Sequence, residues 1–203
     1  VAAGQPFKGI IETIERYQNY RPVDQGLGSD SSVNGIVAAA HDVLHGRQPN
    51  PSFNLEENNF EFVECAKEEI GEEVLKYYFN IFPNLFCKDF SDAQDDIQIL
   101  SPQRNGLAGI SSLNDAIQLK LTANKSPIFE GKNGVKFYVN DRVIQTSNIY
   151  DLGVMNGEIG TVISRNERGI TLLIDDKEIV YSKDDMYDLA LSYAISIHKS
   201  QGS

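Results

Sequence analysis

The most informative stretch of this 203-residue chain is Tyr193-Ala-Ile-Ser-Ile-His-Lys-Ser-Gln-Gly-Ser203. Its first half is apolar and β-prone, and its second half is a cluster of small polar residues with one lysine. An apolar strand that opens into a small polar turn presents hydroxyls, a cation and backbone N–H groups, and these are the groups that contact phosphate. The stretch therefore predicts a buried strand that ends in a phosphate-binding turn.

The same eleven residues resemble the motif with which superfamily 1 DNA helicases, of the RecD and UvrD/Rep type, couple a single DNA strand to ATP. Serine stands at position 196, where threonine is commoner in the family, and it keeps the hydroxyl. The resemblance implies that Gly202 lets the turn approach a nucleotide phosphate. It also implies a set of contacts to single-stranded DNA, made by Ser196, His198, Lys199, Ser200 and Gln201.

A second segment, Gln18-Asn-Tyr-Arg21, is similar to the motif that opens the second motor domain of UvrD/Rep-type helicases. In that family the arginine reaches the γ-phosphate of ATP held by the first motor domain, and a guanidinium fork suits phosphate oxygens. The resemblance implies that Arg21 is a catalytic residue that contacts ATP. A solvated arginine is the alternative interpretation. Pro22 departs from the family's usual serine, and the loop over 24–32 is longer than usual.

A third resemblance covers residues 139–162, which look like the helicase segment that enters a barrel inserted in this motor domain. Buried amides need partners, so Gln145 and Asn148 are predicted to contact either the DNA backbone or neighbouring loops. Ser101 precedes a proline at the expected carboxyl end of a strand, where parallel sheets bind ligands. We expect Ser101 to contact DNA, and capping of a turn is its alternative role.

The order of elements predicts an α/β protein. Helical spacing of apolar residues covers 7–17, 36–44 and 111–121, and a helix rich in Glu and Lys is expected over 66–79. Short β-prone runs at 60–63 and 97–100 alternate with these helices, as in a parallel sheet. Five closely spaced runs, separated by turns, then predict a small SH3-like barrel: 135–139, 142–146, 158–164, 169–174 and 178–182.

The resemblance therefore implies a RecA-like parallel sheet flanked by helices, with an inserted SH3-like β-barrel. We expect the first part of a second RecA-like motor domain over 1–133 and the barrel over 134–182. Residues 183–203 are expected to return to the RecA-like sheet, through a buried strand that begins near Leu189, and to start the DNA-coupling motif.

Composition limits the function classes. Apolar residues at 41% and charged residues at 23% describe a soluble globular protein. No apolar run approaches the roughly 20 residues that span a bilayer, and the first residues lack the features of a signal peptide. We expect a cytoplasmic protein with no membrane partner.

Metal and disulfide sites are not expected. Cys65 and Cys87 are too few for a disulfide framework or a tetrahedral zinc site, so we expect free thiols. His41 and His45 have the spacing of a helical zinc pair, but the sequence between them lacks the glutamate of a metalloprotease motif, and no third ligand is evident.

The net charge of −11 is unusual for a protein that binds nucleic acid. The charge is uneven, however: twelve acidic residues and three lysines lie between Glu56 and Asp96, whereas residues 120–142 carry more basic than acidic groups. An acidic outer face and a mildly basic working face are therefore compatible with this composition.

The sequence contains no Gly-x-x-x-x-Gly-Lys-Ser/Thr segment, so it offers no P-loop for the β-phosphate of ATP. We therefore interpret the chain as a fragment of an ATP-dependent DNA helicase that grips single-stranded DNA and senses the γ-phosphate. ATP and Mg²⁺ belong to the parent enzyme, whose N-terminal RecA-like ATP-binding domain is the expected partner. The fragment alone is expected to bind no cofactor and to be inactive.

Two alternatives remain open at this point. One is a non-catalytic nucleic-acid or protein binding module derived from a helicase half. The other is an RNA helicase of the same superfamily.

Overall fold

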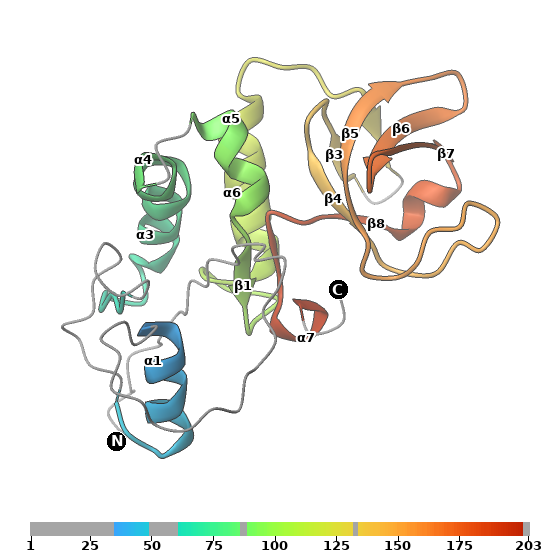
Figure 1. The fold of residues 1–203 in the computed structure, drawn as a ribbon. Coiled ribbons are helices and arrows are strands. Elements are labelled where there is room, and N and C mark those ends of the chain that lie inside the picture. The colour runs from blue at the N-terminus through green and yellow to red at the C-terminus, as the bar shows by residue number, and fades with distance from the viewer. Residues whose placement is uncertain (1–34, 49–60, 86–88, 132–133, 201–203) are drawn as a thin grey trace. The chain divides into compact units, whose positions relative to one another are not determined.

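A computed structural model of the chain describes residues 35–48, 61–85, 89–131 and 134–200 (Figure 1). The contacts divide the chain into two compact units, Val1–Ile97 and Gln98–Ser203. The helix expected over 7–17 and the segment 18–21 with Arg21 lie outside the described residues.

The first unit is helical in its described residues. Helix α1 spans Gly35–Leu44, as expected, and Gly46 follows it with a φ of 71°, the left-handed conformation that commonly ends a helix. The other elements are α3 (Ile70–Lys76), the π-helical turn η1 (Tyr77–Ile81), α4 (Phe82–Leu85), α5 (Phe90–Ala93) and the 3₁₀ turn η2 (Gln94–Asp96).

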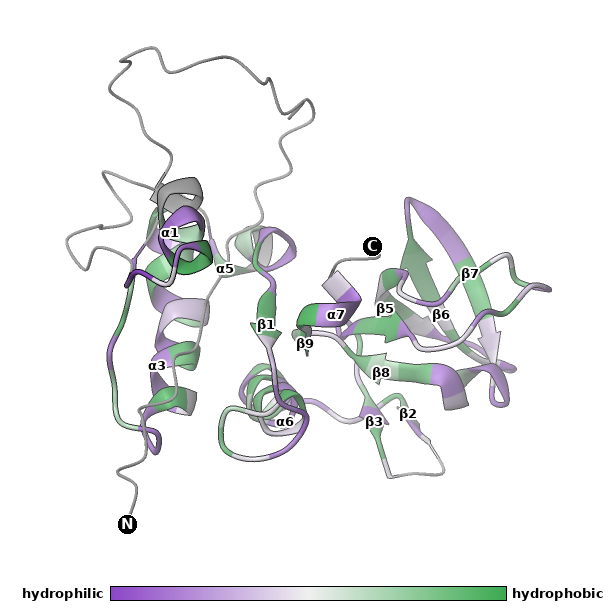
Figure 2. Ribbon diagram, turned by 90° about the horizontal axis from the view of Figure 1, so that it is seen from below, coloured by the Kyte–Doolittle hydropathy of each residue, from purple (hydrophilic) through white to green (hydrophobic). Residues whose placement is uncertain are grey.

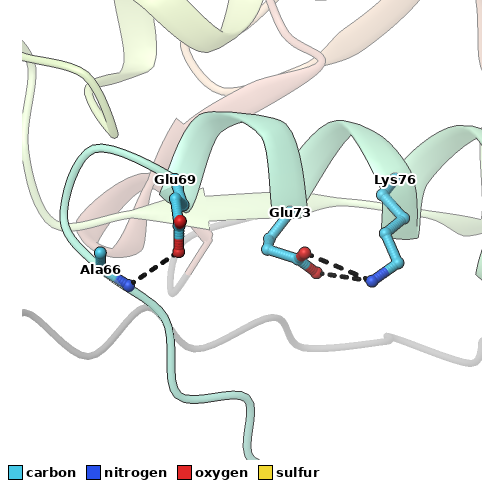
Figure 3. A network of polar contacts seen from close by, with 4 residues as sticks. All are labelled: Ala66, Glu69, Glu73 and Lys76. Atoms are coloured by element: carbon cyan, nitrogen blue, oxygen red, sulfur yellow. Dashed lines mark hydrogen bonds and ion pairs between the residues drawn. The ribbon is translucent and has the colours of Figure 1, made fainter.

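Helix α3 begins four residues later than the helix expected over 66–79, and the helical path continues through η1 and α4. At its start the Glu69 carboxylate accepts the Ala66 N–H at 3.3 Å, and Lys76 pairs with Glu73 at 3.0 Å (Figure 3). Glu68, Glu69 and Glu72 are exposed, so the carboxylates at the start of this helix are in contact with solvent.

The strand expected over 60–63 is not formed by residues 61–63, which have no regular structure. A short apolar run cannot distinguish a strand from an irregular segment, because a strand also needs a neighbour for its backbone groups. The aromatic residues of this unit instead pack against one another between the helical elements. The rings of Tyr77 and Phe82 lie 5.6 Å apart, and Tyr78 meets Phe90 edge-on at 5.3 Å.

The second unit contains a parallel strand pair. Strand β1 (Ile99–Ser101) pairs with β9 (Ala194–Ser196), although more than 90 residues separate them in sequence. The 13-residue helix α6 (Ile110–Thr122) follows β1 and packs against β9, and the short helix α7 (Ile197–Ser200) follows β9 (Figure 1). The strand near 97–100 and the helix over 111–121 are thereby confirmed.

A barrel-like antiparallel sheet lies between β1 and β9 in sequence. Its strand order is β7-β6-β5-β4-β8, and the strands are β4 (Arg142–Gln145), β5 (Ile159–Arg165), β6 (Gly169–Ile174), β7 (Lys177–Ser182) and β8 (Leu189–Leu191). A two-stranded hairpin, β2 (Phe129–Glu130) with β3 (Lys136–Phe137), precedes it, and the 3₁₀ turn η3 (Asp185–Asp188) precedes β8.

The barrel core is apolar and nearly inaccessible, since Val162, Ile170 and Leu172 are each 0% exposed. The expected turns have the backbone that their residues favour: Asp175 and Asp176 both have positive φ between β6 and β7. Gly160 is required by close packing, because a Cβ there would lie 2.5 Å from Ile174 Cγ1. The α/β class with an SH3-like insertion is confirmed.

Leu189–Leu191 differs from expectation. We expected this run to belong to the RecA-like sheet, but β8 pairs antiparallel with β4 and completes the barrel sheet. Of the strands that follow the barrel, only β9 pairs with β1. The run 189–196 is apolar almost throughout, so its pattern cannot show that the chain changes sheets near Ser192. Residues 189–191 pair with β4 because that strand has an open edge. The barrel sheet thus extends past position 182 to Leu191.

Candidate nucleic-acid interface

The described part of the motif, residues 193–200, forms β9 and continues past the carboxyl end of the parallel pair into α7. Ser101 and Ser196 are register partners at the last positions of β1 and β9. Helix α7 follows at once, and its single turn is held locally: Ser196 Oγ accepts the Lys199 N–H at 3.3 Å, and Ser200 Oγ donates to the Ile197 carbonyl at 2.8 Å. Figure 2 shows the hydrophobic β1 beside β9 and the partly hydrophilic α7.

Two of the predicted DNA contacts are accessible on this turn. His198 is exposed and Lys199 is half-buried. Burial lowers the pKa of Lys199, and the positive charge of Arg104, in the loop that follows β1, lowers it further. Lys199 and Arg104 both follow the carboxyl ends of the parallel strands, β9 and β1.

Ser101 is 2% exposed, and its hydroxyl forms hydrogen bonds within the loop that follows β1. Its Oγ donates to the Ala108 carbonyl at 2.7 Å and accepts the Gln103 N–H at 3.2 Å. In the structure Ser101 therefore caps a turn, which was the alternative to the predicted DNA contact. A hydroxyl engaged in this way orders the loop that carries Arg104.

A buried asparagine holds the start of β9. Asn114 on α6 donates from Nδ2 to the Ala194 carbonyl at 2.9 Å and to the Leu191 carbonyl at 3.3 Å, and its Oδ1 accepts the Ala194 N–H at 2.9 Å. Gln98 adds bonds from Nε2 to the carbonyls of Ser192 and Tyr193, both at 3.2 Å. The crossover from the barrel to β9 is thus clamped by side chains.

Asp141 joins the barrel to the motif. Its Oδ1 accepts the Tyr193 hydroxyl at 2.9 Å, and its Oδ2 accepts from Gln118 Nε2 at 2.6 Å and from the Tyr138 N–H at 2.8 Å. Burial raises the pKa of Asp141, although these hydrogen bonds and Lys125 act in the opposite direction. The sequence signalled Asp141 only as a turn residue, so this role was missed.

The two amides expected to contact DNA or neighbouring loops find partners within the barrel unit. Gln145 is 1% exposed, and its Oε1 accepts the Tyr181 hydroxyl at 3.1 Å. Asn148 is exposed, and it accepts the Asn156 N–H at 2.8 Å and donates to the Tyr150 hydroxyl at 3.2 Å. Gln145 is therefore buried in the barrel, and its Nε2 has no hydrogen-bond partner among the described residues, whereas Asn148 lies at the surface.

Comparison with known proteins shows a similarity to RecD-like DNA helicases. Residues 113–175 match the family model described as the SH3 domain of ATP-dependent RecD-like DNA helicases. The matched residues include most of α6 and the barrel through β6. Along the whole chain, 25% of residues are identical over 213 aligned positions to the ATP-dependent RecD2 DNA helicase of Deinococcus radiodurans. The chain is therefore similar to RecD-like DNA helicases, and residues 113–175 correspond to their SH3 domain.

Other RecD-like proteins match shorter parts of the chain. The RecD subunit of the RecBCD enzyme of Mycolicibacterium smegmatis is 29% identical over 109 residues, which is 54% of this chain and 19% of that protein. The chain spans 26% of the Deinococcus relative. Among solved structures, unliganded Pif1 from a Bacteroides species is 28% identical over 34% of this chain and 28% of its own, with a TM-score of 0.27.

Three predicted site residues lie outside the described residues: Arg21, Gln201 and Gly202. Within the described ranges, no group of three or more His, Cys, Asp or Glu side chains could hold a metal ion. The spacing of the two histidines has a structural explanation, since His45 Nδ1 hydrogen-bonds the His41 carbonyl at 2.8 Å.

Two further expectations concern thiols and membranes. Cys65 is a free thiol, and its pKa is raised by burial and by the nearby carboxylates of Glu73 and Glu69. Cys87 lies outside the described residues. None of the described helices has the length and apolar character to cross a membrane.

Proposed function

We propose that this chain is the part of an ATP-dependent DNA helicase that holds single-stranded DNA and contacts the γ-phosphate of ATP. The observation that carries the proposal is the strand-end arrangement, in which β9 delivers Ser196, His198 and Lys199 to the carboxyl edge of a parallel pair. The RecD-like family supports it, since the relative that matches along the whole chain is an ATP-dependent DNA helicase.

In this proposal the exposed His198 and the Lys199 ammonium contact the DNA backbone, and Ser196 positions α7 through its bond to the Lys199 N–H. Lys199 is half-buried, so less water screens its attraction to a phosphate than on an open surface. The clamps at Asn114 and Asp141 keep β9 in place while DNA pulls on α7. Because α7 is fixed to the sheet, DNA bound to α7 would move together with the whole domain, as translocation requires.

ATP and Mg²⁺ are proposed for the complete enzyme. The sequence has no P-loop, and none of the described residues forms a cluster that could hold Mg²⁺, so the ATP-binding domain is proposed to hold both. The proposed contacts of this chain to ATP are those of Arg21, a guanidinium suited to phosphate oxygens, and of Gly202. The partner is a RecA-like ATP-binding domain that supplies the remaining contacts.

Binding of a fluorescein-labelled oligo-dT to the 203-residue chain tests the DNA part of the proposal. By fluorescence anisotropy we expect Lys199→Ala to weaken binding by roughly tenfold, about the loss of one charge-assisted contact. Lys177→Ala is the matched control. It removes an exposed lysine at the start of β7, which is not part of the β1–β9 pair. No binding by the wild type, or equal effects of the two variants, would overturn the proposal. Tighter binding of a matched oligo-rU would favour an RNA helicase.

Hydrolysis of ATP tests the second part. We expect the chain alone to be inactive with or without oligo-dT. In a longer protein that also contains the ATP-binding domain, Arg21→Ala should lower DNA-stimulated hydrolysis by roughly 10³-fold, the lower end of the effect of an arginine finger. A wild-type rate in that variant would show that Arg21 does not contact the γ-phosphate.

A further inference from the structure

Tyr193, the first residue of the DNA-coupling motif, is buried. The residue is 1% exposed, and its hydroxyl donates to Asp141 Oδ1 at 2.9 Å. Asp141 directly precedes β4, so this bond joins the motif to the barrel across 52 residues of sequence. The side chain that opens the motif is therefore bonded to the barrel rather than presented to DNA.

The backbone around Asp141 is fixed to the barrel. The Asn140 N–H donates to the Val162 carbonyl at 2.8 Å, and the Asp141 carbonyl accepts the Val162 N–H at 2.9 Å. Val162 belongs to β5 and is 0% exposed. The Arg142 carbonyl also accepts the N–H of Ser192, the residue before the motif, at 2.9 Å. A displacement of β5 would therefore move the carboxylate that holds the motif.

Helix α6 contributes a second support to the same carboxylate. Gln118 Nε2 donates to Asp141 Oδ2 at 2.6 Å and to the Lys136 carbonyl of β3 at 2.8 Å. A side-chain amide has two N–H donors, so both bonds can be made at once. The Tyr138 N–H also donates to Asp141 Oδ2, at 2.8 Å. A buried carboxylate needs such partners, and here they come from α6, the barrel and the start of the motif.

We propose that Gln118, Asp141 and Tyr193 are positioning residues through which the inserted barrel sets the place of the DNA-coupling turn. This inference rests on the proposed function. The chain passes from Tyr193 through β9 directly into α7, without an intervening loop. A shift at the tyrosine ring is therefore passed along a short extended segment to the turn that carries the proposed DNA contacts. The barrel thereby contributes to the grip on DNA without touching DNA at these residues.

Hydrogen–deuterium exchange tests the positioning without DNA. Tyr193→Phe removes only the hydroxyl, and exchange over 192–196 should be faster by roughly 5- to 150-fold, the range for loss of one buried hydrogen bond. Tyr181→Phe is the matched control, because Tyr181 is 0% exposed and its hydroxyl donates to Gln145 within the barrel. It should alter exchange over 192–196 by less than about threefold. Equal exchange in the two variants would overturn the inference.

Binding of fluorescein-labelled oligo-dT to the 203-residue chain tests the consequence for DNA. Tyr193→Phe should weaken binding by roughly twofold to thirtyfold, the effect of a residue that acts through a contact network, and Tyr181→Phe by less than about twofold. Asp141→Ala should also weaken binding, whereas Asp141→Asn should restore most of it. The asparagine oxygen can accept from Gln118 and Tyr138, and its N–H can donate to the Tyr193 hydroxyl.

The outcomes separate this inference from the proposed function. Unchanged binding of oligo-dT by Tyr193→Phe, or equal loss of binding in Tyr193→Phe and Tyr181→Phe, would overturn the inference. The proposed function would stay intact in either case, provided that Lys199→Ala still weakens binding. A wild-type chain that binds no oligo-dT would overturn both. Thermal unfolding of the two tyrosine variants checks that each retains the fold, so that a difference in binding reports on position and not on global stability.

Discussion

Asn114→Ala is expected to loosen the strand that carries the DNA-coupling motif. The Asn114 side chain is 5% exposed, and its amide binds both the N–H and the carbonyl of Ala194, which is 0% exposed. Alanine leaves both backbone groups without these partners. An unsatisfied buried group costs about 1–3 kcal/mol, so the two together, with some water entering the space, cost about 2–4 kcal/mol of local stability.

Hydrogen–deuterium exchange measured by mass spectrometry over 189–196 tests this value. A loss of about 2–4 kcal/mol should speed exchange at Ala194 by roughly 30- to 700-fold, since 1.4 kcal/mol is tenfold. Asp115→Ala changes the next, exposed residue of α6 and should alter exchange by less than about threefold. Equal protection in Asn114→Ala and Asp115→Ala would refute the argument that Asn114 holds β9.

Three further perturbations concern the barrel and its junction. Tyr181→Phe removes the hydroxyl that donates to Gln145 Oε1, and it should destabilise the barrel by about 1–3 kcal/mol in urea unfolding followed by circular dichroism; an unchanged midpoint would contradict this. Gly160→Ala places a Cβ 2.5 Å from Ile174 Cγ1 and 2.8 Å from the Leu173 carbonyl, and it should lower stability by about 1–3 kcal/mol in the same assay, whereas a stabilised variant would show that the strands separate easily. Asp141 has a folded-state pKa above its ordinary value of 3.8, so the folded state binds the proton more tightly, and stability is lost as pH rises from that value through the folded pKa. Wild type should therefore gain stability relative to Asp141→Asn when the pH is lowered from 7 towards 4, and a pH-independent difference would contradict the assignment.

Local patterns predicted the elements whose conformation depends on neighbouring residues. Short β-prone runs separated by turns identified β5, β6 and β7 to within one or two residues, and helical spacing identified α6. The turn at Asp175 and Asp176 followed from the tolerance of aspartate for positive φ. These signals are local, so one sequence is sufficient to detect them.

Contacts between distant segments were not predictable in the same way. Asp141 and Tyr193 are 52 residues apart, and Asn114 and Ala194 are 80 residues apart. Nothing in the pattern around Asp141 distinguishes a buried acceptor for a tyrosine hydroxyl from an ordinary turn residue. For the same reason, the sequence could not show that Leu189–Leu191 would pair with β4.

The amino-acid sequence alone determined the chemistry of the motif at 193–203 and its helicase resemblance, because hydroxyls, a lysine and glycine after an apolar run are a local property. Only the tertiary structure decided which polar groups face solvent. It directs the Ser101 hydroxyl into its own loop and encloses Gln145 in the barrel. The availability of a side chain for DNA depends on the neighbours that folding brings to it, and those neighbours come from distant parts of the chain.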